Sequence, residues 1–211
     1  MKAILCRIGW MNTYSGPGCI YFGKTDTGFF ERDDTCGEYW NFLHGPDNII
    51  HGFVMLTARD RNGEYTGTIN INRLGANSND EYIDDIMVIF YAPEPDNNSR
   101  YVINYVVGYY QNARIFRNWS IVDHENDNNN EYREYLPYNF HANPQSTVLI
   151  PTSDRNIEVI TSQYARSQGI PGKYPGQAPV FFGDDEDNEG RRYINSIIKK
   201  LQLNHLLEIK F

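Results

Sequence analysis

The sequence predicts an α+β domain, in which a small curved β-sheet or β-barrel carries helices packed on it. The order of the elements favours this class, because many short strand candidates come first and the helix candidates come late. The chain has 16 tyrosines among 211 residues, and tyrosine favours strands and binding surfaces. This length suits one large domain with a substantial core. We expect the sheet domain over residues 1–182, followed by a C-terminal helix over 183–211 that is an appendage or begins another domain.

The first strand candidates lie close to the N-terminus. Lys2–Ile8 is apolar enough for a buried strand, and Gly9–Cys36 is typical of a long loop. Tyr39–Leu43 and His51–Thr57 are short strand candidates on either side of a turn at Gly45–Asn48. These patterns predict two short strands joined by a turn.

The middle of the chain contains the strongest strand signals. A hairpin turn at Arg61–Gly63 leads into a candidate strand at Thr68–Asn72. Asp85–Tyr91 is the clearest buried strand, and Tyr101–Val107 is placed to pair with it as a hairpin. Residues 123–145 are polar and Asn-rich and predict a loop, and Val148–Ile150 predicts another short strand.

The helix candidates follow. Thr152 can cap a helix over Arg155–Ser167, which Gly169 then stops. Gly176–Phe182 is expected to be extended. A final helix is predicted over Glu189–Leu203, where isoleucines and a leucine keep helical spacing on one face.

The net charge of −8 argues against a protein that grips nucleic acid with a positive coat. The acids, however, are concentrated. Asp123–Glu134 and Asp184–Glu189 hold ten of the 27 acidic residues and one of the 19 basic ones, so the remainder carries 18 basic against 17 acidic residues. A locally neutral or basic face is therefore compatible with the sequence, and any binding should depend more on a pocket than on bulk charge.

The sequence contains no established motif for a catalytic site, a metal site or a cofactor. Its three cysteines, Cys6, Cys19 and Cys36, form no paired framework and no zinc spacing. His124 and His141 fall in the predicted polar loop. The first apolar run is too short for a signal peptide, and no run approaches the ~18 residues that cross a bilayer. We expect a cytoplasmic protein with no membrane partner.

Val106–Arg117 is the most informative stretch of the chain. It combines a buried strand start with a glycine, two tyrosines, two amides and two arginines. A nucleobase next to a phosphate would suit these groups. Because Tyr109 and Tyr110 are adjacent in a strand, they should face opposite ways, so only one can enter a given pocket.

Several short motifs carry a resemblance to a known family. They are Ile8–Met11, Glu38–Phe42, Ile69–Gly75, Ile86–Ala92, Val107–Ala113 and Tyr174–Gln177. Together they resemble the N-terminal module of bacterial HNH-type and other modification-dependent restriction endonucleases. That module is similar to the EVE/YTH branch of the PUA-like superfamily, in which a small β-barrel holds a modified base in an aromatic pocket.

The resemblance implies a site in this chain. Trp10, Trp40 and a tyrosine among Tyr91, Tyr109 and Tyr110 would line the pocket, and Asn112 would read the base edge. Tyr14 completes the predicted pocket, and the predicted contacts with the nucleic-acid backbone are Arg73, Arg114, Arg117 and Lys173. Gln111 follows Tyr110 where the family has a lysine, so strong phosphate binding is in doubt.

Each candidate also has a structural interpretation. The tryptophans can be core or rim packing, Asn112 can cap a turn, and the arginines can be solvated strand-end charges. Trp119 is expected to pack. The predicted function is a non-catalytic module that recognises a modified base in nucleic acid, with DNA as the expected ligand. The module would serve a restriction or phage-defence system and have a nuclease domain or subunit as its partner.

Two alternatives stay open. Aromatic, amide and acidic side chains also suit a carbohydrate or small-molecule ligand. Glu208–Lys210, with Asp184 and Asp185 before it, resembles the end of a metal-dependent nuclease signature. The identity of the modification and the choice between DNA and RNA are not set by these patterns.

Overall fold

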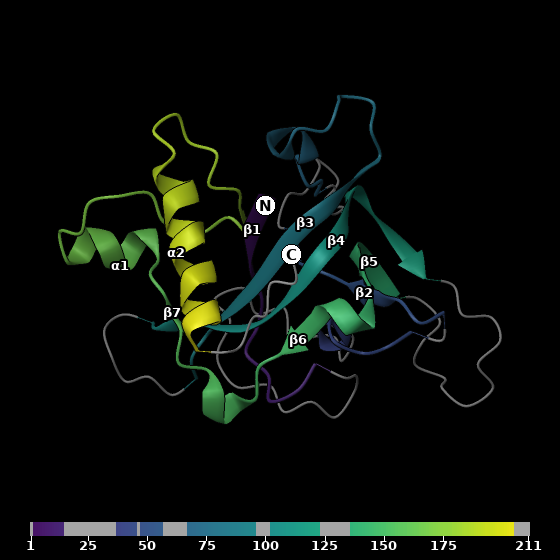
Figure 1. The fold of residues 1–211 in the computed structure, drawn as a ribbon, viewed down its shortest axis with the longest axis horizontal. Coiled ribbons are helices and arrows are strands. Elements are labelled where there is room, and N and C mark those ends of the chain that lie inside the picture. The colour runs from purple at the N-terminus through teal and green to yellow at the C-terminus, as the bar shows by residue number, and fades with distance from the viewer. Residues whose placement is uncertain are drawn as a thin grey trace, which may run out of the picture.

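The computed structural model describes residues 2–14, 37–45, 47–56, 67–95, 102–122 and 136–204. Its centre is a mixed, eight-stranded sheet in the order β2-β5-β4-β3-β1-β8, with β6 and β7 also paired to β4 (Figure 1). The strands are β1 (Lys2–Arg7), β2 (Ile50–Gly52), β3 (Tyr82–Pro93), β4 (Asn104–Val122), β5 (Leu136–Ala142), β6 (Thr147–Leu149), β7 (Glu158–Val159) and β8 (Val180–Phe181).

The helical elements are short apart from the last one. They are η1 (Gly37–Trp40), η2 (Ile71–Leu74), η3 (Pro144–Ser146), η4 (Thr152–Asp154), α1 (Ser162–Ser167) and α2 (Glu189–Leu203). The α+β class and the sheet with helices are confirmed. The sheet does not close, because its path ends at β2 and β8. A closed barrel is therefore not seen, and PUA-like topology stays a prediction.

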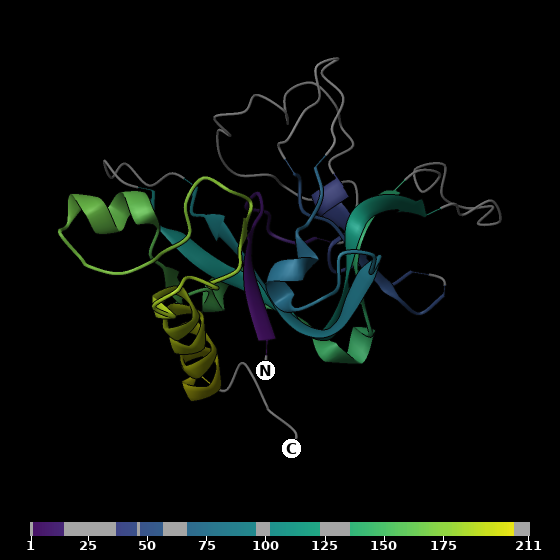
Figure 2. The ribbon, with the colours of Figure 1, turned by 90° about the horizontal axis from the view of Figure 1, so that it is seen from above.

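The antiparallel pair β3–β4 is the spine of the sheet. It contains the predicted strand Asp85–Tyr91 and its predicted hairpin partner, and both are confirmed. The register shifts on both sides of Ile86, and Asp85 and Asn112 adopt positive φ angles of 61° and 51°. Such irregularities bend and twist a strand pair, and Figure 2 shows the strong curvature of β3 and β4.

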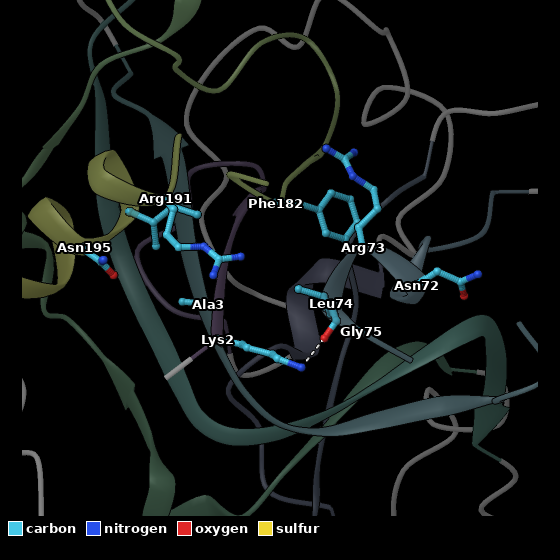
Figure 3. Close-up of a pocket in the computed structure, with 10 residues that line it drawn as sticks. Lys2, Ala3, Asn72, Arg73, Leu74, Gly75, Phe182, Arg191 and Asn195 are labelled. Atoms are coloured by element: carbon cyan, nitrogen blue, oxygen red, sulfur yellow. Dashed lines mark hydrogen bonds between the residues drawn. The ribbon is translucent and has the colours of Figure 1, made fainter. Parts of the chain in front are cut away.

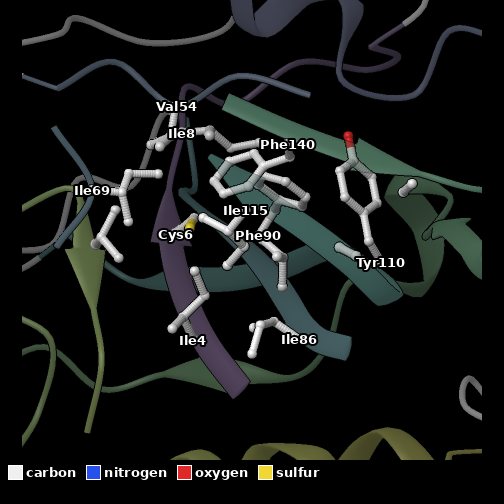
Figure 4. Packing of buried hydrophobic residues seen from close by; sticks show 14 of the residues in the cluster. Ile4, Cys6, Ile8, Val54, Ile69, Ile86, Phe90, Tyr110, Ile115 and Phe140 are labelled. Carbon is white, nitrogen blue, oxygen red and sulfur yellow. The ribbon is translucent and has the colours of Figure 1, made fainter. Parts of the chain in front are cut away.

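The sheet has a core on each side, because successive side chains of a strand alternate between its faces. On the inner side, Ile4, Ile86 and Phe90 belong to a cluster that also contains Ile115 and Phe140 (Figure 4). On the other side, the intervening side chains pack beneath α2; they include Leu5, Met87, Ile89 and Val106.

Helix α2 has the bounds that its periodicity predicts. Its apolar face, formed by Ile194, Ile197, Ile198 and Leu201, is buried against the sheet. Asp185 accepts hydrogen bonds from the backbone N–H groups of Glu189 at 2.8 Å and Gly190 at 2.7 Å. A carboxylate in this position satisfies the first turn of a helix. The helix lies over one half of the sheet, while β5 and β2 lie in the other half (Figure 1).

The predicted helix over Arg155–Ser167 is wrong in its first half. The buried Arg155 guanidinium donates to the backbone oxygens of Ile150 at 2.9 Å and Met11 at 2.7 Å. These bonds accompany a non-helical path at Arg155, and the following segment pairs with β4 as β7. The helix begins only at Ser162, where the Thr161 side chain accepts a hydrogen bond from the N–H of Tyr164.

Three other local predictions are also wrong. Tyr39–Leu43 and Thr68–Asn72 are not strands; the described segments there contain the 3₁₀ turns η1 and η2. The predicted loop over 123–145 contains strand β5, because Phe140 and Ala142 supply apolar side chains to the inner core. The turn at 61–63, Cys19, Cys36, His124 and Glu208–Lys210 lie outside the described residues.

Candidate functional site

The aromatic residues predicted to line a base pocket are buried in the fold. Trp10, Tyr14 and Tyr110 belong to the inner core, whereas Tyr91 and Tyr109 belong to the core beneath α2. The prediction that Tyr109 and Tyr110 face opposite ways is confirmed. Trp40, in η1, is 9% exposed. The structure therefore divides the predicted pocket residues between two sides of the sheet.

Tyr110 is held on all sides in the inner core. Its ring contacts Phe90 edge-on at 4.7 Å and Phe42 at 5.4 Å between centroids. Its hydroxyl donates to the backbone oxygen of Asn41. Burial raises the pKa of this hydroxyl well above its ordinary value. Gly52 leaves the room that the ring needs, because a Cβ there would lie 2.7 Å from it.

The side chains of Tyr14 and Trp10 hold the segment after β1 in place through a hydrogen bond and a cation–π contact. The Tyr14 hydroxyl donates to the Gly9 backbone oxygen at 2.6 Å. The guanidinium of Arg155 lies 4.7 Å from the centre of the Trp10 ring, a cation–π distance. Tyr91 has a fully buried hydroxyl with no hydrogen-bond partner among the residues that the structure describes. Trp10, Tyr14 and Tyr91 are therefore packed within the fold.

The predicted polar contacts are half-buried or exposed, and most of them are paired. Arg114 forms two hydrogen bonds with Asp84, at 2.7 and 3.1 Å. Arg117 donates to the backbone oxygens of Asp80 and Asn77 and to the side chain of Asn72. Asn112 is exposed in the bulge of β4. Of the other two predicted contacts with the nucleic-acid backbone, Arg73 is paired with Asp184, and Lys173 is exposed.

A second group of aromatic residues lies on the outer side of the sheet, in the half away from α2. We call it the outer aromatic strip; its members are Tyr82 of β3, Phe116 of β4, Tyr138 and His141 of β5, and His51 of β2. Register pairs Tyr82 with Phe116, and His51 with His141. Phe116 follows the buried Ile115 and therefore points to the opposite side of the sheet.

The rings of the outer aromatic strip are in continuous contact. The centroid of Phe116 lies 6.1 Å from Tyr82, 5.4 Å from Tyr138 and 4.7 Å from His141. Tyr138 stacks on His141 at 4.6 Å with an interplanar angle of 26°. At one end, Arg114 covers the ring of Tyr82 at 3.9 Å. Tyr82 is still 43% exposed. The strip is thus a semi-open aromatic surface with one arginine.

The two histidines of the strip differ in their surroundings. The Nε2 atom of His51 lies 3.0 Å from a carboxylate oxygen of Asp47. The His51 and His141 rings meet edge to face at 4.6 Å. Burial, with a smaller contribution from the nearby His51, lowers the pKa of His141 to about 4. His141 is therefore neutral near pH 7, and its ring can act as a stacking surface without a charge.

Glu38 is a buried acid beneath the inner core. Its two carboxylate oxygens accept hydrogen bonds from the N–H groups of Gly9 at 2.8 Å and Met55 at 3.3 Å. Burial raises the pKa of Glu38 to about 7, although these two hydrogen bonds oppose that shift. At 4% exposure it is out of reach of a ligand. Its geometry supports a structural link between β1, η1 and the segment after β2.

The described residues contain no cluster of three or more His, Cys, Asp or Glu side chains suited to a metal ion. Asp184 and Asp185, candidates in the nuclease alternative, are engaged by Arg73 and by the first turn of α2. Over the same residues, no helix has the length and apolarity that a membrane crossing requires.

Sequence reasoning did not identify the outer aromatic strip. Tyr138 and His141 lie in a segment whose polar composition predicts a loop. Alternation around the apolar Phe140 predicts that His141 faces outward, but it would place Tyr138 on the same side as Phe140. Trp119, which was expected to pack, is 42% exposed on the same strand as Phe116. Comparisons with protein-family models, curated proteins and solved structures found no match.

Proposed function

We propose that this chain is a nucleic-acid-binding module without catalysis of its own, and that bases stack against the outer aromatic strip. The contact of rings across four strands supports this proposal. No member of the strip belongs to the core that α2 covers. Stacking a base on an aromatic side chain contributes about 1–3 kcal/mol and tolerates different bases. Bases that are flipped out or single-stranded have the free faces that such stacking requires.

The charges around the strip favour recognition by stacking over grip on phosphates. Among the described residues, Arg114 is the cation that contacts a ring of the strip, and it is paired with Asp84. Asp47 adds a further carboxylate beside His51. Few phosphate contacts imply a shallow dependence of affinity on salt. The family resemblance adds the expectation that the base is modified and that the module serves a restriction or phage-defence nuclease acting on DNA.

A second candidate function is carbohydrate binding. The observation in its favour is that Asp47 and Asp84 lie beside the rings, at His51 and Arg114. Carboxylates accept hydrogen bonds from sugar hydroxyls, while an aromatic ring covers the apolar face of a sugar. A glycan array separates the two candidates, because a nucleic-acid module gives no saturable signal there.

Fluorescence anisotropy with labelled oligonucleotides tests the proposed function. Single-stranded and duplex DNA, each with and without methylated or hydroxymethylated bases, are compared at low salt. Tyr82→Ala should weaken binding about 5- to 150-fold, which corresponds to the loss of one stacking contact of roughly 1–3 kcal/mol. Because Tyr82 is 43% exposed, thermal unfolding should change little.

Leu203→Ala is the matched control, because Leu203 is 69% exposed on α2. It should leave affinity unchanged. No binding to any oligonucleotide, or equal losses for Tyr82→Ala and Leu203→Ala, would contradict the proposed function. A preference for a modified base over its unmodified form would add the reader role that the resemblance implies.

A further inference from the structure

A hollow with basic walls is lined by residues of η2, of the start of β1 and of the first turns of α2. Its volume is about 250 Å³ (Figure 3). Three cationic side chains come to it from different elements: Lys2 from β1, Arg73 from η2 and Arg191 from α2. Amide side chains and apolar groups complete the lining, namely Asn72, Asn195, Leu74, Phe182 and Ile194. We call it the basic cavity.

Lys2 is fixed in the basic cavity by the backbone. Its ammonium donates to the Leu74 oxygen at 2.6 Å. The next residue, Gly75, has a φ angle of 91°, and a Cβ there would lie 2.8 Å from the ammonium nitrogen. Glycine therefore both permits the left-handed turn and leaves room for the charge. The ammonium has three N–H donors, and this hydrogen bond uses one of them.

The other two cations of the cavity, Arg73 and Arg191, differ in whether a carboxylate binds them. Arg73 is engaged by the Asp184 carboxylate and lies 4.3 Å above the ring of Phe182. Its hydrogen bonds lower the pKa of Asp184. The Arg191 guanidinium has no hydrogen bond to the described part of the chain, although its charge helps to lower that pKa. Asp184 balances one of the three cations in the described lining of the cavity, so this lining keeps an excess of positive charge.

We propose that the basic cavity binds a phosphate group, held by Arg191 and Lys2. A guanidinium can form two parallel hydrogen bonds with phosphate oxygens, and an ammonium adds a point charge. The apolar floor of Leu74, Phe182 and Ile194 lowers the local dielectric constant and strengthens both attractions. The cavity is smaller than the roughly 300–1,000 Å³ of sites for drug-sized ligands. The ligand is therefore a phosphate with a small attached group.

Such a phosphate has two sources: the 5′ end of a nucleic-acid strand or a small phosphorylated metabolite. The proposal does not depend on the outer aromatic strip, because the cavity shares no residue with it. Binding of inorganic phosphate is measured by calorimetry and by shifts of the backbone amide resonances of Gly75 and Asn195, with sodium chloride at equal ionic strength as reference. We expect saturable binding with shifts at these two amides.

Arg191→Gln and Lys2→Gln should each weaken phosphate binding at least tenfold. Arg192→Gln is the matched control. It removes the same charge from the adjacent residue, whose side chain bonds to the Asp187 backbone oxygen instead and does not line the cavity. It should change affinity less than twofold. Shifts no larger than those with chloride, or equal losses for Arg191→Gln and Arg192→Gln, would overturn the proposal.

Two further ligands identify the source once phosphate binds. A nucleoside monophosphate represents the metabolite, and one oligonucleotide in 5′-phosphorylated and 5′-hydroxyl forms represents the strand end. Tighter binding of the phosphorylated strand, lost in Arg191→Gln, assigns the cavity to nucleic acid; tighter binding of the monophosphate assigns it to a metabolite. Tyr82→Ala should weaken both oligonucleotide forms equally, so failure at the strip is distinguishable from failure at the cavity.

Discussion

The inner core and the outer aromatic strip use the same kinds of residue on opposite sides of the same strands. In the inner core, Tyr110 and Tyr14 have fully buried rings, and their hydroxyls reach backbone oxygens. In the strip, Tyr82 is 43% exposed, and an arginine stacks on it. Aromatic content therefore indicates a binding surface only after the side of the sheet is known. We expect substitutions to separate the two regions into stability and binding.

The largest expected effect is at Tyr110. Tyr110→Ala removes a buried ring and leaves a cavity beside Phe90 and Phe42, which should lower the free energy of unfolding by about 3–5 kcal/mol. Tyr82→Ala should lower it by less than about 1 kcal/mol. Urea unfolding followed by circular dichroism measures both. Similar losses in the two variants would remove the distinction between core and strip.

The second effect is on the pH dependence of stability, in which the two regions oppose each other. Burial raises the pKa of Glu38 from its ordinary 4.5 to about 7. The folded state then binds the proton more tightly, so this group stabilises the fold at low pH and the contribution is lost as pH rises to 7. The full shift corresponds to about 3 kcal/mol.

His141 acts in the opposite direction. Its pKa is lowered from 6.5 to about 4. The unfolded state then binds the proton more tightly, so stability is lost as pH falls from 6.5 toward 4. Partial solvent screening reduces this contribution to about 1–2 kcal/mol. The two slopes partly cancel in the native chain, so its stability should vary only modestly between pH 4.5 and 7.

Two variants expose the separate slopes. In Glu38→Gln, stability should rise with pH over this range, because only the histidine contributes. In His141→Phe, stability should fall with pH more steeply than in the native chain. Urea unfolding at pH 4.5, 5.5, 6.5 and 7.5 measures each slope. Parallel profiles for all three proteins would show that neither group titrates differently in the folded state.

The sequence predicted the parts of the fold that depend on local pattern. Glu189–Leu203 and Asp85–Tyr91 follow from helical spacing and from a run of β-branched residues. The first half of the predicted helix at 155–167 failed because the Arg155 guanidinium bonds to Met11, which is 144 residues away. No local window contains that contact. Strand β5 was missed because its polar neighbours lowered the mean hydropathy.

The candidate site depends on geometry that local pattern does not contain. Alternation predicted that Tyr109 and Tyr110 face opposite ways. It could not say that both sides of the sheet are covered at this point. That cover comes from η1 and Phe42 on one side and from α2 on the other, which are distant in sequence. Bulges add a second difficulty, because each one exchanges the inner and outer sets along a strand.

The smallest expected effect is at Asn112, which marks the boundary between the two regions on β4. Asn112 has a φ angle of 51°, where asparagine and glycine are tolerated and other residues are strained. Asn112→Ala should therefore cost about 1 kcal/mol of stability, and Asn112→Gly should cost a few tenths or less. Urea unfolding measures both changes.

The same pair of variants tests whether the exposed Asn112 amide reads a base. Asn112→Gly removes the amide but keeps the backbone conformation, so a loss of oligonucleotide affinity at unchanged stability would assign a binding role to the side chain. An amide paired with a base edge contributes about 1–3 kcal/mol of discrimination, which is about a 5- to 150-fold change in preference. If Asn112→Gly binds as the native chain does, asparagine is present for the bulge alone, and base recognition belongs to the rings of the strip.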